Sequence, residues 1–168
     1  MSQVSDVNIY ELSPEDARAY NEFFAAGAAR HPDTLRISPA DVRAAPFERM
    51  SSADGVTLAG RDDLGAWLGV VTLERELGRE KRRHIAWVLR MYVPEASAGK
   101  GVGRALLTAA LERARQLPGI SKVNLTVAEH NVRAVRLYES AGFRAFSREV
   151  DAFRDREPRT ELTMSLQL

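Results

Sequence analysis

The chain contains no cysteine, which excludes disulfides, thiolate metal sites and a cysteine nucleophile. It has no apolar run approaching the roughly 20 residues that a helix needs to cross a bilayer. Its opening residues lack the basic start and apolar core of a secretory signal. The 24 basic and 23 acidic residues leave a formal net charge of +1, so no overall field favours nucleic acid or an anionic membrane. We therefore expect a cytoplasmic protein without nucleic-acid or membrane partners.

Apolar residues are plentiful enough for one well-filled core. The chain has 168 residues and is 45% hydrophobic, which is short for two domains, so we expect a single domain over residues 1–168. Apolar runs predict strands at residues 7–12, 56–59, 66–73, 85–93, 122–128, 143–150 and 161–168. Helical spacing and capping residues predict helices at residues 14–29, 39–50, 102–117 and 131–141. This order predicts an α/β fold, a mixed sheet with helices packed on its faces.

Three glycines at alternate positions, Gly99, Gly101 and Gly103, connect a predicted strand to a predicted helix. A helix start without Cβ atoms presents unpaired N–H groups and the positive end of the helix dipole, which suit phosphate oxygens. The Walker loop does not fit, because it needs Ser or Thr after its lysine and Lys100 is followed by Gly101. The G-x-G-x-x-G dinucleotide fingerprint also differs in spacing and in position along the chain. We expect another kind of phosphorylated ligand at this loop.

Two longer blocks contain the loop and the helix farther along, MYVPEASAGKGVGRALL and NLTVAEHNVRAVRLYESAGF. Together they resemble the GNAT superfamily of acetyl-CoA-dependent N-acetyltransferases, most strongly over residues 85–143. The family's second block, N-x-x-A-x-x-L-Y-x-x-x-G-F, is matched at Asn131, Ala134, Leu137, Tyr138, Gly142 and Phe143. The resemblance implies the GNAT fold, a mixed and mostly antiparallel sheet with a splayed parallel strand pair and helices on both faces.

The resemblance also implies acetyl-CoA as the co-substrate, and no metal. The family's pyrophosphate loop, Q/R-x-x-G-x-G/A, falls on Ala98, Gly99, Lys100, Gly101, Val102 and Gly103. Ala98 replaces the usual Arg or Gln, and Lys100 and Arg104 each add a cation beside the phosphates. We expect the pantetheine arm to lie between the splayed strands, against Met91, Tyr92 and Val93 on one side and Asn131, Ala134 and Tyr138 on the other.

By the same resemblance, a substrate amine attacks the acetyl thioester directly in a ternary complex. The backbone N–H of Val93 is expected to polarise the thioester carbonyl, and Tyr138 to protonate the departing thiolate. Family members often carry a glutamate on the strand before the loop, and this sequence has none there. Our candidate base is His84, with Glu74 and Glu76 as alternatives. The missing acid favours an acceptor amine of low pKa, or a base that acts through water.

The expected acceptor is a primary amine on a small molecule or at a protein N-terminus. Its cleft is expected in the N-terminal half and the tail, with candidate residues Phe23, Phe24, His31, Phe47, Trp67 and Phe153. Two alternatives stay open, a non-catalytic acyl-CoA-binding or sensor module and a transferase that uses a longer acyl-CoA. The tail strands also suit pairing in a homodimer.

Overall fold

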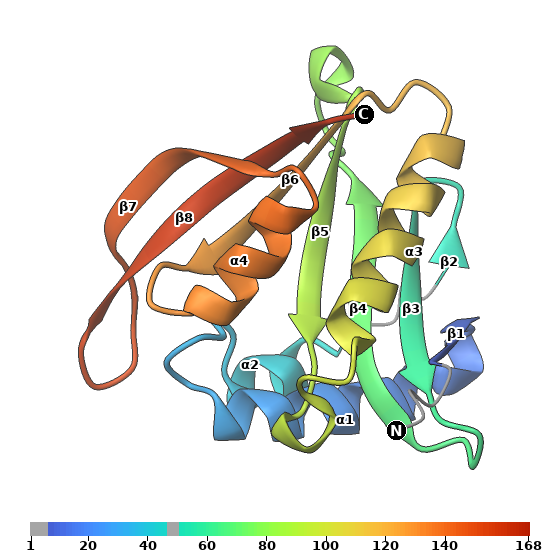
Figure 1. Cartoon of the computed structure of the whole chain (residues 1–168), viewed down its shortest axis with the longest axis vertical. Coiled ribbons are helices and arrows are strands. Elements are labelled where there is room, and N and C mark those ends of the chain that lie inside the picture. The colour runs from blue at the N-terminus through green and yellow to red at the C-terminus, as the bar shows by residue number, and fades with distance from the viewer. Residues whose placement is uncertain (1–6, 47–50) are drawn as a thin grey trace.

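A computed structural model describes residues 7–46 and 51–168. Its eight-stranded sheet has the order β1-β3-β4-β5-β6-β8-β7, and the short β2 pairs with β3 (Figure 1). The strands are β1 (Asn8–Glu11), β2 (Ser51–Ser52), β3 (Gly55–Arg61), β4 (Trp67–Arg75), β5 (Ile85–Tyr92), β6 (Lys122–Ala128), β7 (Arg144–Arg154) and β8 (Pro158–Gln167). Every strand pair in these ranges is antiparallel except β5 with β6. The predicted mixed sheet is confirmed.

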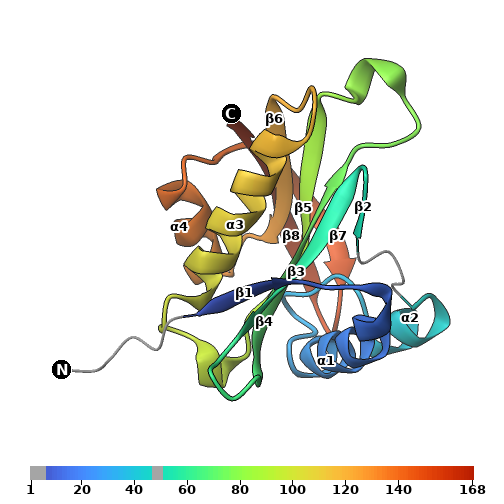
Figure 2. The ribbon, with the colours of Figure 1, turned by 90° about the vertical axis from the view of Figure 1, so that its right-hand side faces the viewer.

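Helices cover both faces of the sheet. Figure 2 shows α1 and α2 on one face and α3 and α4 on the other. Their bounds are α1 (Ala17–Arg30), α2 (Pro39–Ala44), α3 (Val102–Gln116) and α4 (Val132–Ser140). The prediction for α2 was too long, because Ala45 precedes Pro46 and has left the helical region, as residues before proline usually do. The end predicted for this helix, at residues 47–50, lies outside the described residues.

Two clusters of buried side chains hold these layers together. The larger one fills the space between the sheet and α3, where Leu106, Leu107 and Ala110 are fully covered. The smaller one lies between the sheet and α1, where Tyr20 and Phe24 pack against strands β3 to β5. The helical spacing that predicted α1 and α3 is therefore the spacing of residues that face the sheet.

Strands β5 and β6 separate at their C-terminal ends. Their parallel pairing covers only Ile85↔Lys122, Ala86↔Val123 and Trp87↔Asn124. Beyond these pairs β5 is irregular, since its register with β4 shifts between Val70 and Thr72, and Arg90 takes a φ of 50°. An extra residue of this kind bends a strand and increases its twist. The bend directs the end of β5 away from β6 and opens the sheet.

Candidate functional site

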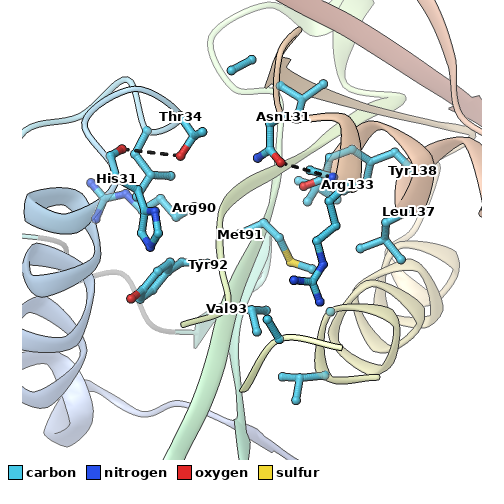
Figure 3. Close-up of a pocket in the computed structure, with 18 of the residues that line it drawn as sticks. His31, Thr34, Arg90, Met91, Tyr92, Val93, Asn131, Arg133, Leu137 and Tyr138 are labelled. Carbon is cyan, nitrogen blue, oxygen red and sulfur yellow. Dashed lines mark hydrogen bonds between the residues drawn. The ribbon is translucent and has the colours of Figure 1, made fainter. Parts of the chain in front are cut away.

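The opening between β5 and β6 is a cavity of about 800 Å³. Its walls are the ends of the two strands, the loop that leads into α3, the inner side of α4, and the segment 31–37 that follows α1. In Figure 3 His31 and Tyr92 stand on one side of it, and Asn131, Arg133 and Tyr138 on the other. A cavity of this size is in the range of small-molecule and cofactor sites.

The glycine-rich loop forms part of the cavity wall. Gly99 and Gly101 have φ values of 74° and 81°, in the left-handed region that residues with a Cβ rarely adopt. Gly103, in the first turn of α3, lies so close to α4 that a Cβ there would be 3.2 Å from Leu137 Cδ2. Gly101 is the N-cap of α3 and has no side chain that could accept a hydrogen bond from the first amides of the helix. Bare amides at a helix start suit anionic oxygens.

Helix α4 presents Asn131 and Tyr138 to the cavity. The Asn131 Oδ1 accepts a hydrogen bond from the Ala134 amide at 3.3 Å and caps the helix. Tyr138 is 5% exposed, and its ring packs edge-on against Phe143 at 6.0 Å between centroids. Burial raises the pKa of Tyr138, because an apolar environment disfavours the phenolate. The group is therefore a protonated phenol at neutral pH.

Most of the residues predicted for the acetyl-CoA site line this one cavity. They are Met91, Tyr92, Val93, Ala98, Gly99, Gly101, Val102, Gly103, Arg104, Asn131, Ala134 and Tyr138. Lys100 belongs to the same loop but is not part of the cavity wall. These residues therefore lie together in the structure, and their individual roles stay predictions.

The candidate bases lie elsewhere. His84 is exposed and precedes the first residue of β5, at the end opposite the cavity, where its carbonyl accepts from the Ser121 and Lys122 amides. Glu74 and Glu76 line a neighbouring hollow. Glu76 accepts hydrogen bonds from Arg82 and from Trp87 Nε1, and its bond to Arg82 lowers its pKa. The structure does not bring these three groups into the cavity wall.

Five charged residues of the cavity wall were missed. They are Arg36, Arg90, Glu95, Arg133 and Glu161. A Cβ on Gly99 would lie 3.7 Å from the Arg133 Nη2, and Figure 3 shows this side chain extending from α4 toward the loop. Arg133 could have been found from the sequence, since it lies inside the matched block NVRAVRLY. Nothing in the local sequence distinguishes Arg36 or Glu161 from surface charges.

The aromatic residues expected around the acceptor divide into two groups. Phe24 and His31 line the cavity. Phe23 and Trp67 instead pack against the smaller core cluster, between α1 and the sheet. There the ring centres of Phe23 and Tyr92 lie 5.3 Å apart. Phe153 is on β7, outside the cavity wall. Phe47 lies outside the described residues.

Among the described residues, no helix is both long enough and apolar enough to span a membrane. No three or more His, Asp or Glu side chains in the same ranges are grouped as metal ligands. The cytoplasmic location stays a prediction.

The sequence is similar to known acetyltransferases. The model of the acetyltransferase (GNAT) family matches residues 17–143. A mycothiol acetyltransferase of Renibacterium salmoninarum is 31% identical over 83% of the chain and 41% of its own length. A spermine/spermidine N(1)-acetyltransferase of Bacillus subtilis is 30% identical over 45% of the chain and 49% of its own length. The matched segments thus cover less than half of these relatives.

The fold has well-matched neighbours among solved structures. A GNAT-family acetyltransferase from Streptococcus pneumoniae superposes with a TM-score of 0.81 at 21% identity, covering 97% of this chain and 100% of the other. A putative acetyltransferase from Salmonella typhimurium, solved with acetyl-CoA, gives 0.80 at 21% identity, with 97% and 94% covered. At this identity the likeness establishes the fold alone.

Proposed function

Because the chain belongs to the GNAT acetyltransferase family, we propose that it transfers an acetyl group from acetyl-CoA to a primary amine. The acceptor is a small molecule or a protein N-terminus. One observation carries the proposal: the sheet opens between β5 and β6 directly beside a loop with two left-handed glycines. A single cavity therefore joins a place for phosphate oxygens to a place for an extended acyl arm.

The residues of this cavity fit acetyl-CoA. The amides of the loop and the first turn of α3 would hold the pyrophosphate, with Arg104 and Arg133 as flanking cations. The separated end of β5, at Met91 to Val93, offers backbone groups that β6 does not pair, so an extended arm can take the place of a strand. When bound, acetyl-CoA supplies an acetyl thioester.

Two groups of the chain would act on the reaction. The Val93 amide, one residue past β5, is proposed to donate to the thioester carbonyl as negative charge develops on the oxygen. The Tyr138 hydroxyl is proposed to donate to the departing sulfur. Both groups border the same cavity, as direct attack in a ternary complex requires.

The charges of the cavity wall do not select one class of amine. Among the described residues, Arg36, Arg90, Arg104 and Arg133 line it, against Glu95 and Glu161. With Arg104 and Arg133 given to the pyrophosphate, the rest of the described wall has two cations and two carboxylates. We therefore propose α-amines, amino sugars and polyamines as the three classes of acceptor to compare.

Thiol release from acetyl-CoA tests the proposal. Alanine amide, glucosamine and spermidine represent the three classes of amine, and thiol release that depends on one of them is expected. Failure with all three, together with tight acetyl-CoA binding by calorimetry, would instead favour the non-catalytic acyl-CoA-binding module. Faster turnover with propionyl- or succinyl-CoA would favour the transferase that uses a longer acyl group.

A further inference from the structure

An amine must lose a proton before it can attack a thioester, so the proposed reaction needs a proton acceptor near the amine. Among the described residues of the cavity wall, the carboxylates are Glu95 and Glu161. Glu95 is exposed, in the short turn between β5 and the glycine-rich loop. It therefore lies on the side of the proposed phosphate site. Glu161 is 6% exposed and comes from another part of the wall.

Glu161 is held where the sheet opens. It lies on β8 opposite Ala128, the last residue of β6, and β6 no longer pairs with β5 at this level. The segment 31–37 borders the same part of the cavity. Its Arg36 Nη1 donates to Glu161 Oε1 at 2.9 Å. The carboxylate therefore borders the cavity beside the segment 31–37, which contains His31, a candidate residue of the acceptor cleft.

The surroundings of Glu161 leave part of the carboxylate available. The bond from Arg36 is its one hydrogen bond within the described ranges, so Oε2 keeps its acceptor capacity. The charged groups that face it are Arg36 from the segment after α1 and Glu149, its cross-strand neighbour on β7. Burial raises the pKa of Glu161, Arg36 opposes the rise, and Glu149 adds to it. A carboxylate with a raised pKa is a stronger base than a solvated one.

We propose that Glu161 is the base that takes the proton from the acceptor ammonium, with Arg36 as its positioning residue; this rests on the proposed function. An N–H bond of the ammonium breaks and an O–H bond forms on Glu161. The neutral nitrogen then forms the C–N bond as the C–S bond breaks, and the sulfur takes the proton of Tyr138. The nitrogen then gives its extra proton to the Tyr138 phenolate, which restores the phenol. Glu161 releases its proton to solvent.

His31 is the competing base. It also lines the cavity, and histidine is a common general base in enzymes. Its ring, however, packs against the ring of Tyr92 at 5.9 Å between centroids. The ring therefore lies at the end of β5, and not at the opening beside β6. We assign His31 to the wall of the acceptor cleft.

The test compares pH profiles of the wild type, Glu161→Gln, His31→Gln and Glu95→Gln with whichever amine of the panel turns over fastest. At pH 7 Glu161→Gln should lose about 10²- to 10⁴-fold in kcat. Its kcat should climb about tenfold per pH unit until the amine itself is neutral, whereas the wild type stays level above the ionisation of Glu161. His31→Gln and Glu95→Gln should keep the acid limb of the wild-type profile, whatever they do to KM or to the level of kcat. A wild-type profile in Glu161→Gln, or loss of the acid limb in His31→Gln, overturns the proposal.

Arg36→Gln keeps the test decisive if Glu161→Gln does not fold, because the Arg36 side chain is 57% exposed. Removing this cation should raise the pKa of the Glu161 carboxyl, measured by carbon-detected NMR on the free protein, and should shift the acid limb of kcat/KM by the same amount. If the pKa of Glu161 moves while the acid limb of the pH profile stays in place, the assignment is also overturned. If the wild type turns over no amine, the proposed function fails, whereas an active wild type with an unaffected Glu161→Gln removes only the base.

Discussion

Gly27 of α1 lies directly against the ring of Tyr92, the last residue of β5. A Cβ built on Gly27 would be 2.6 Å from both Cε1 and Cζ of that ring. The ring cannot easily withdraw, because Phe23 and Phe24 pack against it at 5.3 and 6.5 Å between centroids. Helix α1 therefore fixes the end of the strand that borders the cavity.

The first prediction tests this contact. In an open helix Gly→Ala stabilises by about 1 kcal/mol, but Gly27→Ala should destabilise by about 1–3 kcal/mol, because the methyl group overlaps the Tyr92 ring. In a Tyr92→Leu background the same substitution should become neutral or stabilising. Urea unfolding of the four proteins gives the coupling energy. Equal effects of Gly27→Ala in both backgrounds would contradict the close packing.

The second prediction separates backbone strain from ligand binding. Gly101 and Gly119 have similar φ values, 81° and 77°, and a Cβ on either would meet open space. Alanine at each position should therefore cost about 1–2 kcal/mol of unfolding free energy. Gly101→Ala alone should weaken acetyl-CoA binding in calorimetry, since Gly119 follows α3 and lies outside the cavity. An equal affinity in the two variants would remove Gly101 from the phosphate site.

The third prediction concerns the phenol of Tyr138. Tyr138→Phe should keep acetyl-CoA affinity and lose about 10²- to 10⁴-fold in kcat, because the ring remains and the proton donor is gone. Tyr10→Phe is the matched control, since Tyr10 is 45% exposed and lies on β1 outside the cavity. Thiol release and calorimetry measure the two quantities. Unchanged turnover of Tyr138→Phe across a pH series would exclude the hydroxyl from the mechanism.

The fourth prediction assigns Arg133 to the donor. Arg133→Gln should weaken acetyl-CoA binding about tenfold, the effect of losing one charge-assisted hydrogen bond of about 1.5 kcal/mol, and should reduce the salt dependence of binding. Arg136→Gln makes the same change on the same helix, at an exposed residue outside the cavity, and should bind normally. Similar losses in both variants would point to the net charge of α4 instead of a local contact.

The fifth prediction is a pH dependence of stability. Because burial raises the pKa of Glu161 in the folded state, its contribution to stability is fully present below the unfolded pKa of about 4.3. It is lost as the pH rises through the folded pKa. Glu161→Gln has no such loss, so its stability relative to the wild type should increase as the pH rises from about 4 toward neutrality.

Urea unfolding at several pH values measures this difference. Glu157→Gln removes the same charge from a side chain that is 73% exposed and serves as the matched control. A wild type that gains stability relative to Glu161→Gln with rising pH would mean that the pair with Arg36 outweighs burial.

Much of the fold was predictable because its signals are local. The prediction for residues 122–128 coincides with β6, and that for residues 102–117 exceeds α3 by one residue. The two-residue β2 carries no pattern of its own, since it is defined only by its pairing with β3. Strand β8 starts at Pro158 instead of Glu161, because pairing with β7 extends it beyond its apolar run.

The site was predictable in part for the same reason. The two matched blocks give the residues of one loop and one helix, and nearly all of them line the cavity. Lys100 does not, since a pattern of residue types does not report which way a side chain of a loop points. His84, Glu74 and Glu76 were chosen by closeness in sequence to β5, and they lie outside the cavity wall.

The sequence by itself determined the strand–loop–helix unit at residues 85–117, because glycine conformations and helical spacing act over a few residues. Only the tertiary structure decided the opening beside it. Arg90 takes its left-handed conformation where its guanidinium lies over the Phe24 ring of α1, 5.3 Å from the ring centre. Glu161 likewise meets Arg36, 125 residues away in sequence. Contacts between such distant segments exist only once the sheet and α1 have packed together, so no local pattern reports them.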